Sequence, residues 1–393
     1  MSDMWILGCV CGIAAGLSVM GITPTSEIQA PSVAQVPSQL PGELASQSPG
    51  QSRGQSATNS LGQPANSSWQ LPAPLPAKAP SPLNISGEVF YHIMPIAWRY
   101  GGPAQSNLDE KAVQNQYRFG NFKGIADSIP YLKSLGVTAI WINPIFPSPA
   151  YHGYQHGPAD QINPWFGTED EFKSLVDACR GQGIKVFLDL VVYGINQDSV
   201  YFKGAKGNPA SGYGPMLAFT DSGNSKFIGY DFKTWNGDTI GFVNWDLRRT
   251  SSKRLVFEWS KKWVDPRFGV AGFRLDHVWQ KYDKGPDGLG YHIDSFWKEW
   301  RDEIESVHPK VFTFAEQANW LSFGAELLRT TTGKRVHDAT FTKPFEFAAR
   351  EALRDEKAEK LYLSIAATLT ACPDGYTFMG IIGDHDVCLL YTS

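Results

Sequence analysis

The stretch Val270-Ala271-Gly272-Phe273-Arg274-Leu275-Asp276 is an apolar run that ends on a carboxylate. Two later stretches have the same form, namely Val311-Phe312-Thr313-Phe314-Ala315-Glu316 and Phe378-Met379-Gly380-Ile381-Ile382-Gly383-Asp384-His385-Asp386. An apolar run of this length is typical of a strand that is buried on both faces. Acids at the C-terminal ends of successive parallel strands converge at one mouth if the strands form a barrel. The three stretches therefore predict a parallel barrel with several carboxylates at a single opening.

Strand-like and helix-like segments alternate along the chain from residue 89 onward. The pattern predicts strands at residues 89–96, 137–142, 184–192, 270–275, 311–314, 335–341 and 376–382. Helices are predicted at residues 125–135, 169–180, 251–264 and 293–307, and across residues 344–371. Residues 194–245 are rich in Gly, Asn and aromatic residues and are interpreted as an excursion after the third strand. This is the pattern of an α/β fold, a (β/α)8 TIM barrel, that lacks its last β/α unit.

The segments outside the barrel have other compositions. Residues 1–30 are predicted to be a signal peptide or N-terminal anchor, because residues 6–22 are almost continuously apolar. The protein is therefore expected to be secreted or periplasmic, or else membrane-anchored with its barrel outside the cytoplasm. Residues 31–83 are rich in Pro, Ser and Gln and predict a disordered linker. The barrel is assigned to residues 84–387, and residues 388–393 to a non-native tail, because their back-translation resembles a sequencing adapter.

Charge and composition exclude some partners. The net charge is -4 and no basic stripe is present, so a nucleic-acid partner is not expected. The 13 Trp, 15 Tyr and 23 Phe residues would suit a surface on which sugars stack. Only Cys179 and Cys372 lie in the predicted barrel, and no disulfide framework is predicted.

Asp276 and Glu316 end consecutive predicted strands, where their side chains can face each other. Cleavage of a glycosidic bond with retention requires a nucleophilic carboxylate and a carboxylic acid whose carboxyl groups lie about 5 to 5.5 Å apart. Strand alternation places Arg274 on the same face as Asp276, and its charge is expected to keep that carboxylate ionised. Apolar neighbours such as Phe314 are expected to raise the pKa of Glu316. The pattern predicts Asp276 as the nucleophile and Glu316 as the acid.

With these residues the chain resembles the alpha-amylase family, glycoside hydrolase family 13. The resemblance covers residues 84–387 and rests first on residues 272–276 and 314–316, which match the nucleophile and acid/base strands. His385-Asp386 matches the end of the Asn-His-Asp motif of the family, whose Asp grips sugar hydroxyls. Residues 151–154 match a loop whose Tyr stacks under the sugar, and Asp189 matches an acid that supports the Arg.

The resemblance implies a retaining glycosidase that cleaves α-glucosidic bonds in an α-1,4-glucan or oligosaccharide through a covalent glycosyl-Asp intermediate. It assigns Asp276, Glu316 and Asp386 to catalysis. It assigns substrate binding to His152, Tyr154, Arg274 and His385, with Asp189 behind them. No catalytic metal is predicted.

The sequence also departs from the family pattern. Tyr193 and Gly194 occupy the positions of an Asn that is commonly a calcium ligand and a His that binds substrate. A Ca2+ site is therefore only an option, and no cofactor is assigned. Asp384 replaces the Asn of the Asn-His-Asp motif.

Three alternatives stay open. The same residues could perform transglycosylation or isomerisation, or the barrel could bind carbohydrate without catalysis. A metal-dependent hydrolase would use Asp276, His277, Asp384, His385 and Asp386 as ligands. The metal alternative is weaker, because His277 is expected to face away from Asp276 on a strand.

Overall fold

The computed structural model describes residues 6–7, 87–102, 119–233, 237, 239–278, 288–317, 319 and 321–385. All of them belong to one of the two compact units of the chain, which comprises Met1–Ile13 and Ser67–Ser393. The predicted linker, the predicted tail and all of the predicted signal segment except Ile6–Leu7 lie outside the described residues. Within the described ranges, no helix combines the length and apolarity needed to cross a bilayer.

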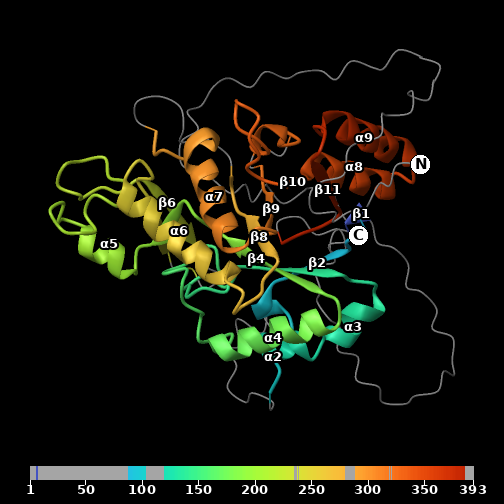
Figure 1. Ribbon diagram of the computed structural model, residues 1–393, viewed down its shortest axis with the longest axis horizontal. Helices are drawn as coiled ribbons and strands as arrows, with labels where there is room; N and C mark the ends of the chain where they lie inside the picture. Colours follow the sequence, from blue (N-terminus) through green and yellow to red (C-terminus); the bar gives the residue numbers. More distant parts are fainter. Residues whose placement is uncertain are drawn as a thin grey trace, which may run out of the picture. The chain divides into compact units, whose positions relative to one another are not determined.

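A parallel sheet forms the centre of the unit, in the strand order β1-β11-β10-β9-β8-β4-β3-β2 (Figure 1). The strands are β1 (Ile6–Leu7), β2 (Phe90–Ile93), β3 (Ala139–Ile142), β4 (Lys185–Leu190), β8 (Gly272–Leu275), β9 (Phe312–Ala315), β10 (Ala339–Thr342) and β11 (Thr377–Ile381). The last seven of these are the seven predicted strands. Their unbroken parallel order confirms the barrel-type fold, with one β/α unit fewer among the described residues than a closed (β/α)8 barrel contains.

Helices connect the strands and cover the outside of the sheet. They are α2 (Phe122–Ala126), α3 (Ile129–Ser134), α4 (Glu169–Gly181), α6 (Thr250–Val264), the π-helical turn η2 (Ile293–Trp297), α7 (Lys298–Val307), α8 (Lys343–Arg354) and α9 (Ala358–Ala371). Two short 3-10 turns, η1 (Pro95–Ala97) and η3 (Ala325–Leu327), also lie among the described residues. Helix α4 begins with a capping box in which Thr168 and Glu171 satisfy each other's backbone donors. The predicted helix at residues 125–135 is divided in two, and Pro130 lies in the first turn of α3, where its missing N–H costs nothing.

Strand alternation separates two apolar layers. One cluster lies between strands and helices, and the other fills the inside of the barrel with Phe90, Trp141, Phe187, Phe312, Phe314, Met379 and their neighbours. Phe187 is two residues before Asp189 on β4, so that acid lies on the inner face as well. The register of β4 and β8 then pairs Asp189 with Arg274. Strand register therefore brings two of the predicted site residues together.

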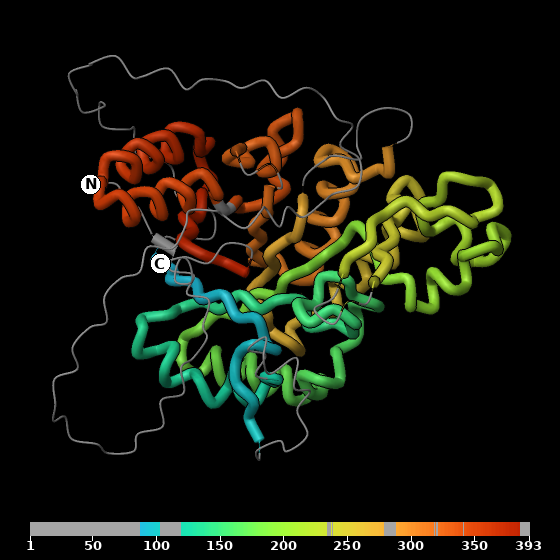
Figure 2. Tube along the Cα trace, turned by 180° about the vertical axis from the view of Figure 1, so that it is seen from behind, coloured from blue at the N-terminus to red at the C-terminus, as the bar shows by residue number. Residues whose placement is uncertain are grey.

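The excursion after the third strand has its own sheet. It contains β5 (Gly194–Asn196), α5 (Val200–Ala205), β6 (Gly229–Lys233) and β7 (Thr239–Asn244), with the antiparallel order β5-β7-β6. The short helix α5 was not expected from the sequence. Figures 1 and 2 show this segment at the end of the unit away from α8 and α9. Trp245 N donates to Tyr193 O at 2.9 Å, so the excursion returns to the barrel beside the end of β4.

Candidate active site

Arg274 is the centre of the candidate site. Its side chain is fully buried, and Nη1 lies 2.9 Å from Asp189 Oδ1 and 2.6 Å from Asp276 Oδ1. Nη2 of the same guanidinium lies 2.8 Å from Glu316 Oε2. The three acids follow or end β4, β8 and β9, which are neighbours in the sheet. One buried cation therefore contacts three buried carboxylates at the C-terminal ends of adjacent strands.

Asp276 and Glu316 lie close enough to act on one sugar. A carboxylate oxygen of each, together with a ring nitrogen of His277, lies within 4.8 Å of the others. Retaining glycosidases have their two carboxyl groups about 5 to 5.5 Å apart, whereas inverting enzymes need about 6.5 to 9.5 Å for an intervening water. A separation of 4.8 Å or less between one oxygen of each acid is closer to the retaining than to the inverting distance.

His277 does not face away from the acids, so that expectation is wrong. Its φ angle is 45°, which ends the strand alternation directly after Asp276. Its backbone N–H donates to Glu316 Oε2 at 3.1 Å, and its ring comes near both carboxylates. The guanidinium of Arg274 nevertheless supplies positive charge to the same two carboxylates, and this disfavours a divalent cation between them.

The electrostatics of the acids differ from the expectation. Burial raises the pKa of Asp276, and the positive charges of His277 and Arg274 only partly oppose this. Burial would also raise the pKa of Glu316, but Arg274, His277 and Lys343 outweigh it and lower the pKa to about 2. The predicted raised pKa of Glu316 is therefore wrong for this arrangement, because the guanidinium contacts Glu316 as well as Asp276.

Asp189 anchors the other side of Arg274. Its Oδ2 accepts from Trp141 Nε1 at 2.9 Å and from the Tyr154 hydroxyl at 2.7 Å. Burial raises the pKa of Asp189 to about 6, although Arg274 lowers it. Trp141 was missed from the sequence, because a Trp in an apolar strand has no signal that separates a hydrogen-bonding role from core packing.

The predicted substrate-binding residues gather beside these acids. The Tyr154 ring stacks on His385 with centroids 4.8 Å apart, and the ring of His152 lies 5.3 Å from that of Tyr154. Burial, followed by the charge of His385, lowers the pKa of His152 to about 3, so His152 is neutral around pH 7. The structure therefore brings Tyr154, His152 and His385 together, whereas the predicted catalytic residue Asp386 lies outside the described residues.

Tyr193 takes part in the site in a way that the sequence did not indicate. Its hydroxyl donates to Asp276 Oδ2 at 3.0 Å. A phenol engaged in this way offers no charged oxygen to Ca2+, which prefers carboxylate and carbonyl ligands, so this residue does not fit a calcium site. At Gly194 a Cβ would lie 2.4 Å from the Phe242 ring, so a His side chain could not stand there without displacing that ring.

A second buried ion cluster lies at the ends of β10 and β11. Lys343 Nζ lies 2.5 Å from Asp384 Oδ2 and 3.4 Å from Glu346 Oε2, and all three side chains are buried. The carboxylate at the position of the family's Asn is thus neutralised by a lysine from the start of α8. Lys343 was missed because the sequence shows it only as a polar residue before Pro344, where the predicted helix began.

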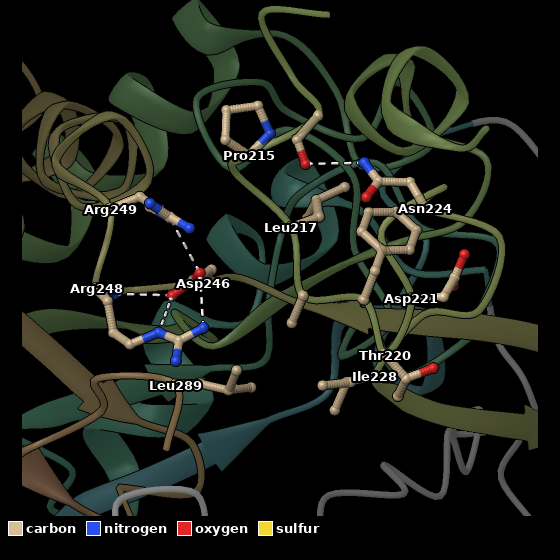
Figure 3. A pocket seen from close by; sticks show the side chains of 13 residues that line it. Pro215, Leu217, Thr220, Asp221, Asn224, Ile228, Asp246, Arg248, Arg249 and Leu289 are labelled. Atoms are coloured by element: carbon tan, nitrogen blue, oxygen red, sulfur yellow. Dashed lines mark hydrogen bonds and ion pairs between the residues drawn. The ribbon is translucent and has the colours of Figure 1, made fainter. Parts of the chain in front are cut away.

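A cavity of about 470 Å³ lies in the excursion and is lined by none of the candidate site residues. Figure 3 shows Arg248 and Arg249 directed at Asp246 on one wall and Asn224 on another. The two arginines lie 2.7 and 3.2 Å from the oxygens of Asp246. The charges of both arginines are partly neutralised by Asp246.

Comparison with known proteins places this chain in a family. The family model "Alpha amylase, catalytic domain" matches residues 102–390. The chain therefore belongs to the alpha-amylase family.

The individual relatives share less than a third of their aligned residues with this chain. An amylopullulanase of Thermoanaerobacterium saccharolyticum is 28% identical over 311 residues, which is 71% of this chain and 23% of the relative. Alpha-amylase 2 of Dictyoglomus thermophilum is 29% identical over 214 residues, 53% of this chain and 34% of the relative. The chain thus spans about a quarter to a third of these curated relatives.

Among solved structures, the fold is similar to that of the cyclic alpha-maltosyl-(1-->6)-maltose hydrolase from Arthrobacter globiformis in complex with maltose. The TM-score is 0.61 at 21% identity, and the match covers 76% of this chain and 66% of the other. At this identity the match supports the fold alone.

Proposed function

We propose that the chain is a retaining glycoside hydrolase that cleaves α-glucosidic bonds in an α-glucan or oligosaccharide. The observation that carries the proposal is the pair Asp276 and Glu316, whose carboxylate oxygens lie within 4.8 Å of each other. Membership of the alpha-amylase family supports it. The amylopullulanase and alpha-amylase among the relatives support an α-linked glucose substrate.

In the first step, a carboxylate oxygen of Asp276 attacks the anomeric carbon and forms a glycosyl ester. The bond to the leaving oxygen breaks, and Glu316 gives that oxygen a proton. In the second step, Glu316 takes a proton from water, whose oxygen attacks the anomeric carbon and releases Asp276. If a sugar hydroxyl replaces the water, the same residues catalyse transglycosylation.

Glu316 must hold a proton before it can act as the acid. Arg274 Nη2 lies 2.8 Å from its carboxylate and favours the ionised form. A sugar between the two acids would exclude water from Glu316 and draw the Asp276 charge towards the anomeric carbon. With the sugar in place, Arg274 would stay with Asp276 and lose its contact with Glu316. The pKa of Glu316 would then rise towards the range of a general acid.

The remaining residues bind the sugar. Tyr154 presents an aromatic ring that is fixed by its hydroxyl bond to Asp189, and such a ring suits the apolar face of a sugar. His152 and His385 border this ring and can donate to sugar hydroxyls. Asp386 follows His385 in the sequence and is proposed to bind sugar hydroxyls, as the family resemblance implies.

Variants of the two acids test the proposal. Asp276→Asn and Glu316→Gln change an oxygen into a nitrogen with little change in shape, and each should reduce kcat by more than about a thousandfold. Glu326→Gln is a matched control, because this acid contacts Gln317 and Ser322 rather than Arg274. Reducing-sugar release from starch and maltooligosaccharides measures the result, and equal activity of all variants would support a barrel that binds carbohydrate without catalysis.

We also propose that the chain is exported, either secreted or periplasmic, or membrane-anchored through its N-terminal segment. The apolar residues 6–22 support this proposal. Fractionation of cells that express the full chain would test it. Recovery of all of the protein from the cytoplasm would contradict it.

A further inference from the structure

We propose that Tyr193 is a positioning residue, which holds the carboxylate of Asp276 in the plane required for attack on the anomeric carbon. The inference rests on the proposed retaining mechanism. It concerns a position where the family resemblance implied a calcium ligand and where this chain has a phenol instead.

Two donors on different parts of the fold hold the two oxygens of Asp276. Arg274 Nη1 lies 2.6 Å from Oδ1, and the Tyr193 hydroxyl donates to Oδ2 at 3.0 Å. The terminal torsion of an Asp side chain has a broad energy profile, so one donor alone leaves the carboxylate free to turn. Two donors fix its plane. Whichever oxygen attacks, the other remains held.

The Tyr193 ring is itself held in place. Its ring makes edge contacts with Phe242 and Tyr291, at centroid distances of 5.5 and 6.2 Å, and stacks on His277 at 6.0 Å. Its carbonyl accepts from Trp245 N at 2.9 Å. The excursion strand β7, which contains Phe242, therefore fixes the hydroxyl that reaches Asp276.

The hydroxyl remains a donor through the working pH range. Burial, followed by the neighbouring Tyr230 and Asp276, raises the pKa of Tyr193 well above its ordinary value. The phenol therefore keeps its proton while Asp276 changes from carboxylate to ester and back. A donor to this carboxylate stabilises its ionised form, which is the attacking group in the first step and the leaving group in the second.

The groups that face Asp276 determine how the loss of this donor would be detected. Arg274 lies on β8, the strand that Asp276 follows, and His277 is the next residue after Asp276. Asp189 lies on β4, and Glu316 directly follows β9. Tyr193→Phe leaves all four in place and removes one donor to the carboxylate. The pKa of Asp276 should then rise, and the acid limb of the kcat/KM profile should move to higher pH.

The experiment compares the full chain with its Tyr193→Phe and Tyr201→Phe variants on maltooligosaccharides. Tyr201 is a matched control: it lies on α5 of the excursion, its ring packs against Trp245 and Trp259, and the acid that acts on its hydroxyl is Asp160 rather than Asp276 or Glu316. We expect Tyr193→Phe to lower kcat about tenfold to a hundredfold with KM changed less than about threefold. Tyr201→Phe should leave kcat and the pH profile unchanged. An unchanged kcat and acid limb in Tyr193→Phe would overturn the inference.

If Tyr193→Phe does not fold, two unnatural amino acids placed at position 193 provide a second test. 4-Aminophenylalanine at position 193 retains a donor, whereas 4-methylphenylalanine fills the same space without one. The amino form should keep kcat within about fivefold of the natural chain, and the methyl form should lose as much as Phe. Equal kcat values for the two would overturn the inference.

Asp276→Asn, measured in parallel, separates this inference from the proposed function. If Asp276→Asn remains fully active, the proposed mechanism itself fails. If Asp276→Asn is inactive while Tyr193→Phe is unchanged, only the role of Tyr193 fails.

Discussion

Arg274 Nη2 lies 2.8 Å from Glu316 Oε2, so the proposed proton donor shares its counter-charge with the proposed nucleophile, Asp276. The same guanidinium lies 2.6 Å from Asp276. The two acids are therefore electrostatically coupled through one side chain, and a change at Arg274 should affect both.

Arg274→Lys should reduce kcat/KM by at least about a hundredfold, because a lysine is a point charge that cannot contact three carboxylates in a planar fork. The control is Arg267→Lys, at an exposed pair with Asp265. Steady-state kinetics of both variants provide the measurement. Activity of Arg274→Lys close to that of the natural chain would show that charge alone is sufficient.

Glu346→Gln should change stability in a pH-dependent way. Burial, reinforced by Asp384 and opposed by Lys343, raises the pKa of Glu346 to about 7. Below the ordinary pKa both the folded and the unfolded chain hold the proton. Between about 4.5 and 7 the unfolded chain releases it while the folded chain keeps it, so folding becomes less favourable as pH rises and levels off above 7.

The Gln variant should therefore be more stable than the natural chain at pH 8, by on the order of 1 to 3 kcal/mol, and equally stable at pH 4.5. Urea unfolding at the two pH values measures this difference. Glu351→Gln, on the more exposed face of the same helix, is the control. A pH-independent difference for Glu346→Gln would contradict the prediction.

Lys343→Met should destabilise the chain, because it leaves the buried Asp384 carboxylate without its lysine. Loss of one partner of a buried ion pair costs about 3 to 5 kcal/mol. Addition of Asp384→Asn, which restores the residue typical of the family, should recover most of that loss. Thermal unfolding of the single and double variants measures the coupling, and purely additive effects would show that the pair is not coupled.

Gly272→Ala should weaken the barrel, because a Cβ at this position would lie 1.7 Å from Phe312 O on the neighbouring strand. Relief of that overlap requires β8 and β9 to separate, at a cost of about 1 to 3 kcal/mol or more. At Gly212 a Cβ would meet nothing within 4 Å, so Gly212→Ala is the control. Equal urea midpoints for the two variants would show that β8 can accept the methyl group.

The sequence predicted the strands and the paired acids because both depend on local patterns. Apolar runs locate buried strands, and an acid at the end of such a run identifies the mouth of a parallel barrel. Residues 270–275 and 311–314 were placed within two residues of β8 and β9.

The remaining features depend on contacts between distant segments. Tyr193 and Asp276 are 83 residues apart, and nothing in the spacing indicates that a phenol reaches the carboxylate. The low pKa of Glu316 depends on which way the Arg274 guanidinium turns, and the approach of His277 depends on one positive φ angle. Neither is encoded in strand periodicity.

Trapping of the covalent intermediate would identify the residue that attacks the anomeric carbon. An α-glucosyl fluoride with a second fluorine at C5 slows release of the sugar from the nucleophile, so that the adduct can be digested and mapped by mass spectrometry. We expect a single fluoroglucosyl adduct on Asp276, which Asp276→Asn abolishes. An adduct on another carboxylate, or turnover of the reagent with inversion and no adduct, would contradict it.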